Sequence, residues 1–111
     1  MTPITADLIL MVVNKIATAV HPDRIVLFGS WARGSAGPNS DMDLIVVESE
    51  PFTAGRSRRK ETARIEMALK DLTVPVDLLL YSRDEMERWA SDENHILSRA
   101  MREGKVLYGR P

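Results

Sequence analysis

Two aspartates separated by a single residue are the side chains of this sequence that most directly suggest chemistry. Asp41 and Asp43 stand just before an apolar run at residues 44–47. Because side chains two apart in a strand point to the same face, we expect the two carboxylates side by side, with Met42 and Leu44 entering the core behind them. Carboxylates this close repel each other unless divalent cations lie between them, and Mg²⁺ prefers one or two carboxylates together with phosphate oxygens and water. The pair therefore predicts a Mg²⁺ site that also holds phosphate.

A third carboxylate and a Gly-Ser pair are predicted to join this site. Asp77 lies inside the apolar segment 76–80, where a charge costs free energy unless it is paired or bound to a metal. Gly29 and Ser30 end the apolar run 24–28. A residue without a side chain lets a phosphate approach the backbone, where a hydroxyl and free N–H groups can donate hydrogen bonds to it. The pattern predicts a phosphate cradle beside a metal pair.

Each of these residues also has a purely structural interpretation. A Gly-Ser pair after a strand is usually only a turn. Asp41 could cap a turn while Asp43 faces solvent on an edge strand, and Asp77 could be a surface carboxylate at a strand end. Two features favour the site: the aspartate pair follows Ser30 after eleven residues, and the apolar run behind the pair indicates a buried strand.

Residues in and around the intervening loop carry two interpretations each. Ser40 is expected to be a turn or backbone-capping hydroxyl, and a substrate contact is the alternative. Arg33 is expected to brace the loop by pairing with a carboxylate, and a phosphate contact is the alternative. Trp31 is expected to pack under the loop rather than to stack on a base. His21 and His95 lie away from the motifs without metal-ligand spacing, and we interpret them as surface or helix-end residues.

Local signals predict the elements that position these residues. Thr2-Pro3 suits a helix start, and apolar side chains then recur at helical spacing until a predicted end near His21-Pro22. A buried strand is predicted at 24–28, followed by a turn-rich segment. A second strand, at 41–47, is expected to be central in its sheet because its second half is apolar on both faces.

The second half of the chain continues the alternation of helices and strands. Its predicted elements include a helix at 56–72, a strand at 74–81 and an edge strand at 105–108. Between the two strands, Ser82 and Glu85 have the spacing of a capping box for one helix. Ser91 or Asp92 is predicted to cap a last helix that stops at Gly104.

This order of elements predicts an α/β (α+β) fold, in which a small mixed β-sheet has helices packed on it. The chain has 111 residues, of which 44% are apolar, and this suits one compact core. We therefore expect residues 1–111 to form a single domain.

Composition argues against several classes of function. With 15 basic and 16 acidic residues the net charge is -1, so the chain lacks the positive field of a general nucleic-acid binder. The absence of cysteine removes disulfides, thiolate metal sites and cysteine nucleophiles, and it suits a reducing compartment. The longest apolar stretch, 8–13, is far too short for a membrane span, and no signal sequence opens the chain. We expect a cytoplasmic protein without a membrane or general nucleic-acid partner.

A basic cluster crowds the start of the helix predicted at 56–72. Its members are Arg56, Arg58, Arg59, Lys60 and Arg64. A solvated helix face is the usual explanation for such a run. Because positive charge opposes the dipole at a helix start, a contact with phosphate or an acidic partner is the alternative.

Three motifs resemble the signature of an enzyme family. They are Gly29-Ser30, Ala32-Arg33-Gly34 and Ser40-Asp41-Met42-Asp43-Leu44. This combination resembles the minimal nucleotidyltransferases, the short-chain branch of the DNA polymerase beta superfamily, and residues 100–109 also look typical of that branch. Other phosphate motifs fit badly, because residues 29–34 lack the Lys-Ser/Thr ending of a P-loop and the three glycines of a dinucleotide fingerprint.

The resemblance implies a polymerase beta-like nucleotidyltransferase fold and two-metal transfer of a nucleoside monophosphate from ATP or another nucleoside triphosphate. By analogy, Asp41 and Asp43 bind two Mg²⁺ ions, and Asp77 helps to hold the metal and to activate the nucleophile. Gly29 and Ser30 inherit the grip on the triphosphate. The candidate nucleotide contacts are thus Gly29, Ser30, Arg33 and Ser40.

The resemblance also implies a protein partner. Larger relatives carry an additional domain that presents the acceptor, and 111 residues are too few to include one. By analogy the acceptor is a helical HEPN ribonuclease toxin, and this chain is the antitoxin that attaches AMP to it. Two alternatives stay open: an antitoxin that blocks its partner by occlusion without turnover, and the nucleotide-binding subunit of a two-chain enzyme for a small molecule. The sequence leaves the oligomeric state, as a homo- or hetero-oligomer, undecided.

Overall fold

Five helices and four strands make up the part of the chain that the computed structural model describes, residues 3–37 and 40–109. In chain order the elements are α1 (Pro3–Val20), β1 (Arg24–Phe28), α2 (Gly29–Arg33), β2 (Met42–Glu48), α3 (Arg58–Ala68), β3 (Val76–Ser82), α4 (Arg83–Trp89), α5 (Ile96–Glu103) and β4 (Lys105–Gly109). None of the helices in these ranges is long and apolar enough to cross a membrane. Thr2, predicted to start the first helix, lies outside the described residues.

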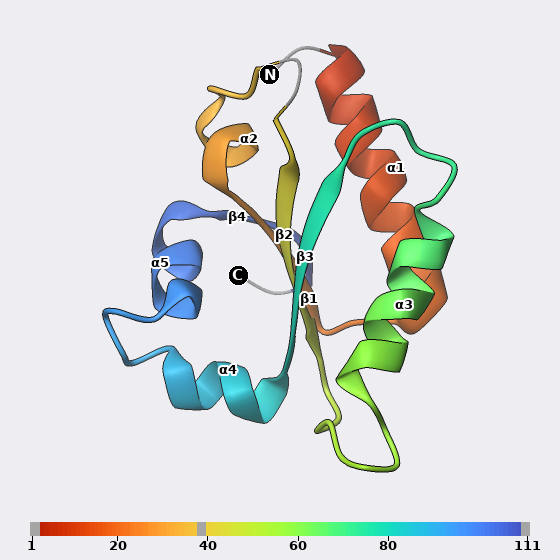
Figure 1. Cartoon of the computed structure of the whole chain (residues 1–111). Helices are drawn as coiled ribbons and strands as arrows, with labels where there is room; N and C mark the ends of the chain where they lie inside the picture. The colour runs from red at the N-terminus through yellow and green to blue at the C-terminus, as the bar shows by residue number, and fades with distance from the viewer. Residues whose placement is uncertain (1–2, 38–39, 110–111) are drawn as a thin grey trace.

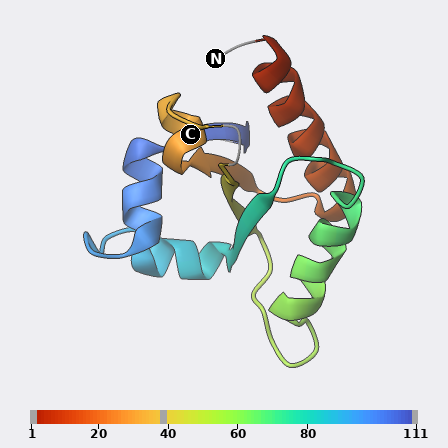
Figure 2. The same ribbon diagram turned by 45° about the horizontal axis from the view of Figure 1, so that its top comes forward.

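The strands form one mixed sheet in the order β3-β2-β1-β4. Strand β1 pairs antiparallel with β2 and β4, whereas β2 and β3 run parallel. A parallel pair needs a crossover connection, and α3 lies within it. Helices α1 and α3 cover one face of the sheet, and α4 and α5 lie on the other (Figures 1 and 2). The predicted fold class, the central position of the second strand and the C-terminal edge strand are all confirmed.

The side chains of β2 alternate between the two halves of the core. Leu44 and Val46 are buried against α1 and α3, and Ile45 and Val47 are buried against α5. Burying one such aliphatic side chain contributes about 1.5–3 kcal/mol, so a slip of one residue in register would cost several of these terms at once. The same alternation directs Asp43 toward the face that carries α4 and α5.

The segment after β1 begins with the short helix α2, where the sequence predicted only turns. Gly34 ends α2 in a left-handed conformation with φ 75°. Its N–H donates a hydrogen bond to the Trp31 carbonyl at 3.4 Å. A left-handed residue after the last turn is the common glycine end of a helix. A helix of five residues is too short to show an apolar period, and for this reason the sequence pattern missed it.

Helix α3 is shorter than the predicted helix at 56–72. Ser57 caps it, and the Ser57 hydroxyl accepts a hydrogen bond from Lys60 N–H at 3.3 Å. Its last residue is Ala68, and Leu69 and Leu72 continue into a turn in which Leu72 N–H donates to the Leu69 carbonyl at 3.0 Å. Leu69 and Leu72 are thus spaced as on a helix but pack from the turn after α3. Their spacing made the predicted helix about one helical turn too long at its C-terminal end.

The N-cap of α5 is His95, so the prediction of Ser91 or Asp92 was wrong. His95 Nδ1 accepts a hydrogen bond from Leu97 N–H at 3.1 Å, and the ring stacks on Trp89 with the centroids 4.8 Å apart. The Asp92 carboxylate instead accepts a backbone hydrogen bond within the preceding turn. The helix therefore starts one turn later than Asp92 would allow.

The capping box predicted for α4 is confirmed. The Ser82 hydroxyl accepts from Glu85 N–H at 3.2 Å, and the Glu85 carboxylate accepts from Ser82 N–H at 2.9 Å. Arg58 of α3 donates to the same carboxylate at 3.0 Å and to the Leu80 carbonyl at 2.7 Å. These contacts tie the start of α4 to the crossover helix and to β3.

Candidate active site

Asp43 and Asp77 are register partners on the parallel strands β2 and β3. Neighbouring strands lie about 5 Å apart, so the structure brings these two predicted site residues together. Asp41 stands two residues before Asp43, just outside β2. Asp43 is half-buried, whereas Asp41 and Asp77 are exposed. The three aspartates therefore lie at the same end of the sheet, where β2 and β3 begin.

The carboxylates at this end of the sheet interact electrostatically. Burial raises the pKa of Asp43 above its ordinary value of 3.8, and the negative charges of Asp77 and then Asp41 raise this pKa further. The positive charge of Arg33 lowers it. Like charges around a half-buried carboxylate are unfavourable until positive charge reaches them. The local chemistry therefore favours a bound cation.

The donor set of this site consists of carboxylate oxygens, the ligand class of Mg²⁺ and other hard divalent cations. The crowding around Asp43 fits such an ion, since its charge would relieve the repulsion. Within residues 3–37 and 40–109, however, no three His, Cys, Asp or Glu side chains are grouped closely enough to hold a metal. A Mg²⁺ site formed by Asp41, Asp43 and Asp77 therefore stays a prediction.

Gly29 lies directly against Asp43, at the junction of β1 and α2. Its φ of 71° is left-handed, and a Cβ added to it would collide with the Asp43 carboxylate. The missing side chain therefore allows the backbone at the end of β1 to touch the carboxylate site. Ser30 follows as a half-buried residue of α2, so the predicted phosphate cradle adjoins the predicted metal ligands.

Trp31 and Ser40 hold the loop between α2 and β2. The Trp31 indole Nε1–H donates to the Ser40 carbonyl at 3.1 Å, and the ring packs against the core on the α1 side. The Ser40 hydroxyl accepts from Gly37 N–H at 2.9 Å. These contacts agree with Trp31 as a residue packed under the loop and with Ser40 as a turn or backbone-capping hydroxyl, and a nucleotide contact of Ser40 stays a prediction.

Arg33 ends α2 with an exposed side chain. Across the described ranges, no carboxylate lies within ion-pair distance of its guanidinium, so the predicted brace is not found there. Its charge nevertheless acts on the pKa of Asp43. This arrangement leaves Arg33 suited to its other interpretation, a phosphate contact.

Most of the basic cluster before and within α3 is engaged in structural contacts. Arg56 pairs with Glu48 at 2.7 Å and with Glu61 at 3.2 Å. Arg58 binds the start of α4, as described above. Arg64 donates to the Ala19 carbonyl of α1 at 2.7 Å. These contacts favour a bracing role over a ligand site.

A small pocket beside Gly29 includes residues that the sequence motifs did not indicate. It has a volume of about 190 Å³, and it is lined by Phe28, Gly29, Arg33, Ile96, Arg99, Ala100 and Glu103. The last four residues recur at intervals of three, one and three, so they form one face of α5. Their spacing was readable as a helix face, but nothing in the sequence placed this face beside Gly29.

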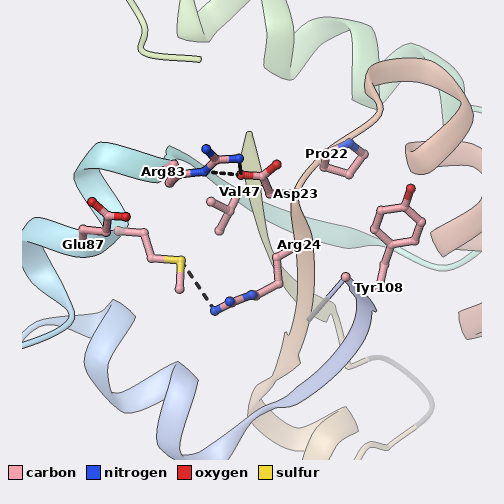
Figure 3. Close-up of a pocket in the computed structure, with 9 residues that line it drawn as sticks. Pro22, Asp23, Arg24, Val47, Arg83, Glu87 and Tyr108 are labelled. Atoms are coloured by element: carbon pink, nitrogen blue, oxygen red, sulfur yellow. Dashed lines mark hydrogen bonds and ion pairs between the residues drawn. The ribbon is translucent and has the colours of Figure 1, made fainter. Parts of the chain in front are cut away.

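A larger cleft of about 630 Å³ lies at the opposite end of the sheet. It is lined by Arg24 and Val47, which are register partners at the far end of the β1–β2 pair from Asp43. Figure 3 shows Arg83 paired with Asp23, at 2.7 Å, on one side of this cleft, and Tyr108 on the other. The cleft is thus separate from the carboxylate site.

Solved structures similar to this one include a proposed nucleotidyltransferase and toxin–antitoxin components. A proposed nucleotidyltransferase from Sulfolobus solfataricus matches with a TM-score of 0.59 and 19% identity, over 94% of this chain and 79% of the other. A toxin–antitoxin structure with AMP-PNP matches with a TM-score of 0.56 and 20% identity, over 91% and 73%. A complex of a tri-AMPylated Shewanella oneidensis HEPN toxin with MNT antitoxin matches with a TM-score of 0.52 and 20% identity, over 93% and 73%.

A comparison with curated protein sequences gives no significant match. The family model of the nucleotidyltransferase domain, in contrast, matches residues 11–107, which include the whole carboxylate site. This chain therefore belongs to the nucleotidyltransferase domain family, and its fold is similar to that of the solved nucleotidyltransferase and toxin–antitoxin structures described above.

Proposed function

We propose that this chain transfers AMP from Mg²⁺-bound ATP to an acceptor hydroxyl on a HEPN-type toxin, and that it neutralises the toxin in this way. The observation that carries the proposal is the meeting of three features at one end of the sheet. Asp43 and Asp77 are register partners, Asp41 adds a third negative charge, and Gly29 touches Asp43. A backbone position that a phosphate can approach, here Gly29, beside crowded carboxylates suits metal-assisted phosphoryl transfer.

The reaction exchanges one bond to phosphorus for another. The acceptor oxygen bonds to the α-phosphorus, and the bond from the α-phosphorus to the oxygen that bridges to the β-phosphate breaks, which releases pyrophosphate. Asp77, at the exposed edge of the sheet, takes the proton of the acceptor hydroxyl. Gly29 and Ser30 hold the triphosphate by backbone N–H groups and the Ser30 hydroxyl, with Arg33 and Ser40 as further contacts.

Asp41, Asp43 and Asp77 are the residues that would hold two Mg²⁺ ions. When bound, Mg²⁺ stabilises the negative charge that develops on the attacking and leaving oxygens. Burial raises the pKa of Asp43, and the charges of Asp77 and then Asp41 raise it further, so without a cation these carboxylates repel one another. Their placement is thus unfavourable for the fold alone, and this supports a role in binding.

The acceptor and donor are proposed from structural relatives. Two of the similar structures are toxin–antitoxin assemblies, one with AMP-PNP and one with a tri-AMPylated HEPN toxin. These relatives support ATP as the donor and a HEPN toxin as the acceptor. The absence of cysteine supports a cytoplasmic setting. The two core clusters pack on one shared sheet, and this supports one domain over residues 1–111.

The test is incubation of the chain with Mg²⁺, ATP and its co-purified toxin, followed by intact-mass measurement of the toxin. We expect discrete mass steps of one AMP each. Asp41→Asn combined with Asp43→Asn should abolish the steps, since each 1.36 kcal/mol of lost transition-state stabilisation lowers the rate about tenfold. Asp7→Asn with Asp71→Asn is the matched control: it removes the same charge at exposed positions elsewhere and should leave the steps intact.

The alternative is an antitoxin that acts by occlusion. It is favoured if no mass step appears and the double variant at Asp41 and Asp43 protects cells from the toxin as well as the parent does. Mass steps on a co-purified small molecule, in place of the toxin, would indicate a two-chain small-molecule enzyme. Mass steps on the toxin that persist in the double variant would remove these aspartates from the mechanism.

A further inference from the structure

Helix α5 borders the face of the sheet on which the carboxylate site lies. Leu97 and Ala100 of α5 are buried in one cluster with Ile45 of β2, and Phe28 packs on the same cluster. Asp43 shares the face of Ile45 because the two residues are two positions apart in one strand. Phe28 is also the register partner of Asp43. One face of α5 therefore lies next to the nucleotide site, although the two are far apart in the sequence.

The C-terminal end of α5 meets the end of β1 closely. Gly104, which follows α5, lies so near the Leu27 carbonyl that a Cβ there would collide with it. The pocket of about 190 Å³ described above fills the space between this end of α5, Gly29 and Arg33. A ligand group that lies beside Gly29, on the β1 side of the carboxylates, would therefore lie in this pocket.

We propose that Arg99 of α5 binds the terminal phosphates of the nucleoside triphosphate, opposite Arg33, across this pocket; the assignment rests on the proposed function. Both arginines line the pocket, both are exposed, and neither has a carboxylate within ion-pair distance among the residues described. Arg24, Arg59, Arg88 and Arg102 also have no ion pair among the described residues, so what distinguishes Arg33 and Arg99 is that both line this pocket. Guanidinium groups match phosphate oxygens in geometry and charge.

The strand order explains why the terminal phosphates point toward Arg99. Displacement at the α-phosphorus requires the attacking and leaving oxygens on opposite sides of it. Asp77 lies on the edge strand β3, Asp43 on β2, and Gly29 at the end of β1, so these residues span about 10 Å across three strands. An acceptor activated at Asp77 pushes the pyrophosphate toward β1, and beyond Gly29 on that side lie Arg33 and α5.

One carboxylate, Glu103, also lines the pocket. It lies four residues after Arg99, one turn along α5. Two guanidinium groups and one carboxylate leave the lining positively charged, which suits a polyphosphate. The assignment therefore also predicts the sign of a second effect: Glu103→Gln should strengthen polyphosphate binding.

The test compares the binding of Mg²⁺-ATP, Mg²⁺-pyrophosphate and AMP by calorimetry. For Arg99→Ala we expect affinity for ATP and pyrophosphate to fall about tenfold or more, because the variant loses charge-assisted hydrogen bonds to phosphate oxygens. AMP binding should be unchanged. Arg99→Lys should lose less. Arg102→Ala is the matched control: it removes the same charge from the same helix, but Arg102 contacts Ser98 and does not line the pocket.

The outcomes separate this assignment from the proposed function. If the parent binds no Mg²⁺-ATP, both fall. If the parent binds Mg²⁺-ATP, and Arg99→Ala and Arg99→Lys bind it as tightly as the parent does, the Arg99 assignment falls and the proposed function stands. Equal losses for ATP and AMP would place Arg99 at the nucleoside or the α-phosphate, the parts that the two ligands share, and would also overturn the assignment. Should Arg99→Ala fail to fold by circular dichroism, Arg99→Lys and Glu103→Gln decide the question with their opposite expected effects.

Discussion

Gly29 touches the carboxylate of Asp43 so closely that a side chain at residue 29 would occupy the position of Asp43 Oδ2. Two independent requirements for glycine coincide at this residue. Its φ of 71° is costly for other residues, and the space for a Cβ is already filled. The position of the predicted phosphate cradle relative to the carboxylates thus depends on this contact.

Gly29→Ala is expected to destabilise the protein by more than the left-handed backbone alone explains. Gly34→Ala is the matched control, because Gly34 has a similar φ of 75° but open space around its Cβ position. The control should cost about 1–2 kcal/mol, and Gly29→Ala should cost clearly more. The measurement is urea unfolding of both variants. Equal losses would show that the Asp43 contact has no energetic consequence.

Asp43→Asn is expected to leave the metal-free protein as stable as the parent or more stable at neutral pH. The pKa of Asp43 is higher in the folded state than in the unfolded state, so the protonated carboxyl group stabilises the folded state. This contribution to stability is lost as pH rises through the folded-state pKa. The advantage of the variant should therefore appear as pH rises. The same change should abolish the thermal shift that Mg²⁺-ATP gives the parent. At a ligand concentration of about 100 times the dissociation constant, this ligand should raise the unfolding free energy of the parent by about 2.7 kcal/mol.

Thermal unfolding with and without Mg²⁺-ATP checks both halves of this prediction, and Asp71→Asn, exposed in a turn, controls for the change in net charge. A metal-free Asp43→Asn protein that is clearly less stable than the parent would instead assign Asp43 a structural role.

Glu48 should make stability fall as pH rises. It is 3% exposed, and its Oε2 has no hydrogen-bond partner among the residues described. Burial, and then the nearby Glu61 carboxylate, raise the pKa of Glu48 to about 7, although Arg56 opposes the rise. A raised pKa means that Glu48 contributes stability below pH 4.5 and loses this contribution as pH rises through about 7.

Glu48→Gln should therefore flatten the pH dependence of the unfolding free energy between pH 4.5 and about 7. The difference from the parent should be on the order of 2 kcal/mol. Glu50→Gln is the control, since Glu50 also pairs with Arg56, at 3.6 Å, but its side chain is 74% exposed. The prediction fails if the two variants show the same pH profile.

Ser82→Ala should lower the unfolding free energy by about 0.5–2 kcal/mol, because it removes one half of the capping box of α4. Ser91→Ala should have an effect near zero, since Ser91 is exposed and α5 is capped by His95 instead. Chemical denaturation of both variants is the measurement. An effect of Ser91→Ala as large as that of Ser82→Ala would contradict the observed cap.

The strands and the neighbourhood of their carboxylates could be predicted from the sequence because the signals are local. An apolar run on both faces indicates a central strand, and strand alternation separates Asp43 from Leu44. An aspartate inside the apolar strand around residue 77 stands out for the same reason. The metal-binding and catalytic roles of these carboxylates stay predictions.

Features that depend on contacts between distant segments could not be predicted. Nothing near Arg99 in the sequence indicates that its helix face lies beside Gly29, because this depends on how α5 packs against β1. The His95 cap was missed for a related reason. Serine and aspartate are preferred at the N-cap, and the stacking of His95 on Trp89 outweighs that preference only in the folded chain.

The parallel pairing of β2 with β3 has a consequence for the order in which the protein folds. Gly29 directly follows β1, which pairs antiparallel with β2 through the connection that holds α2, whereas Asp77 reaches Asp43 only after the longer crossover through α3 has closed. Contacts between residues close in the sequence form sooner, because less chain entropy is lost in closing the loop. A partly folded chain would thus bring Gly29 against Asp43 before the third carboxylate, Asp77, joins them.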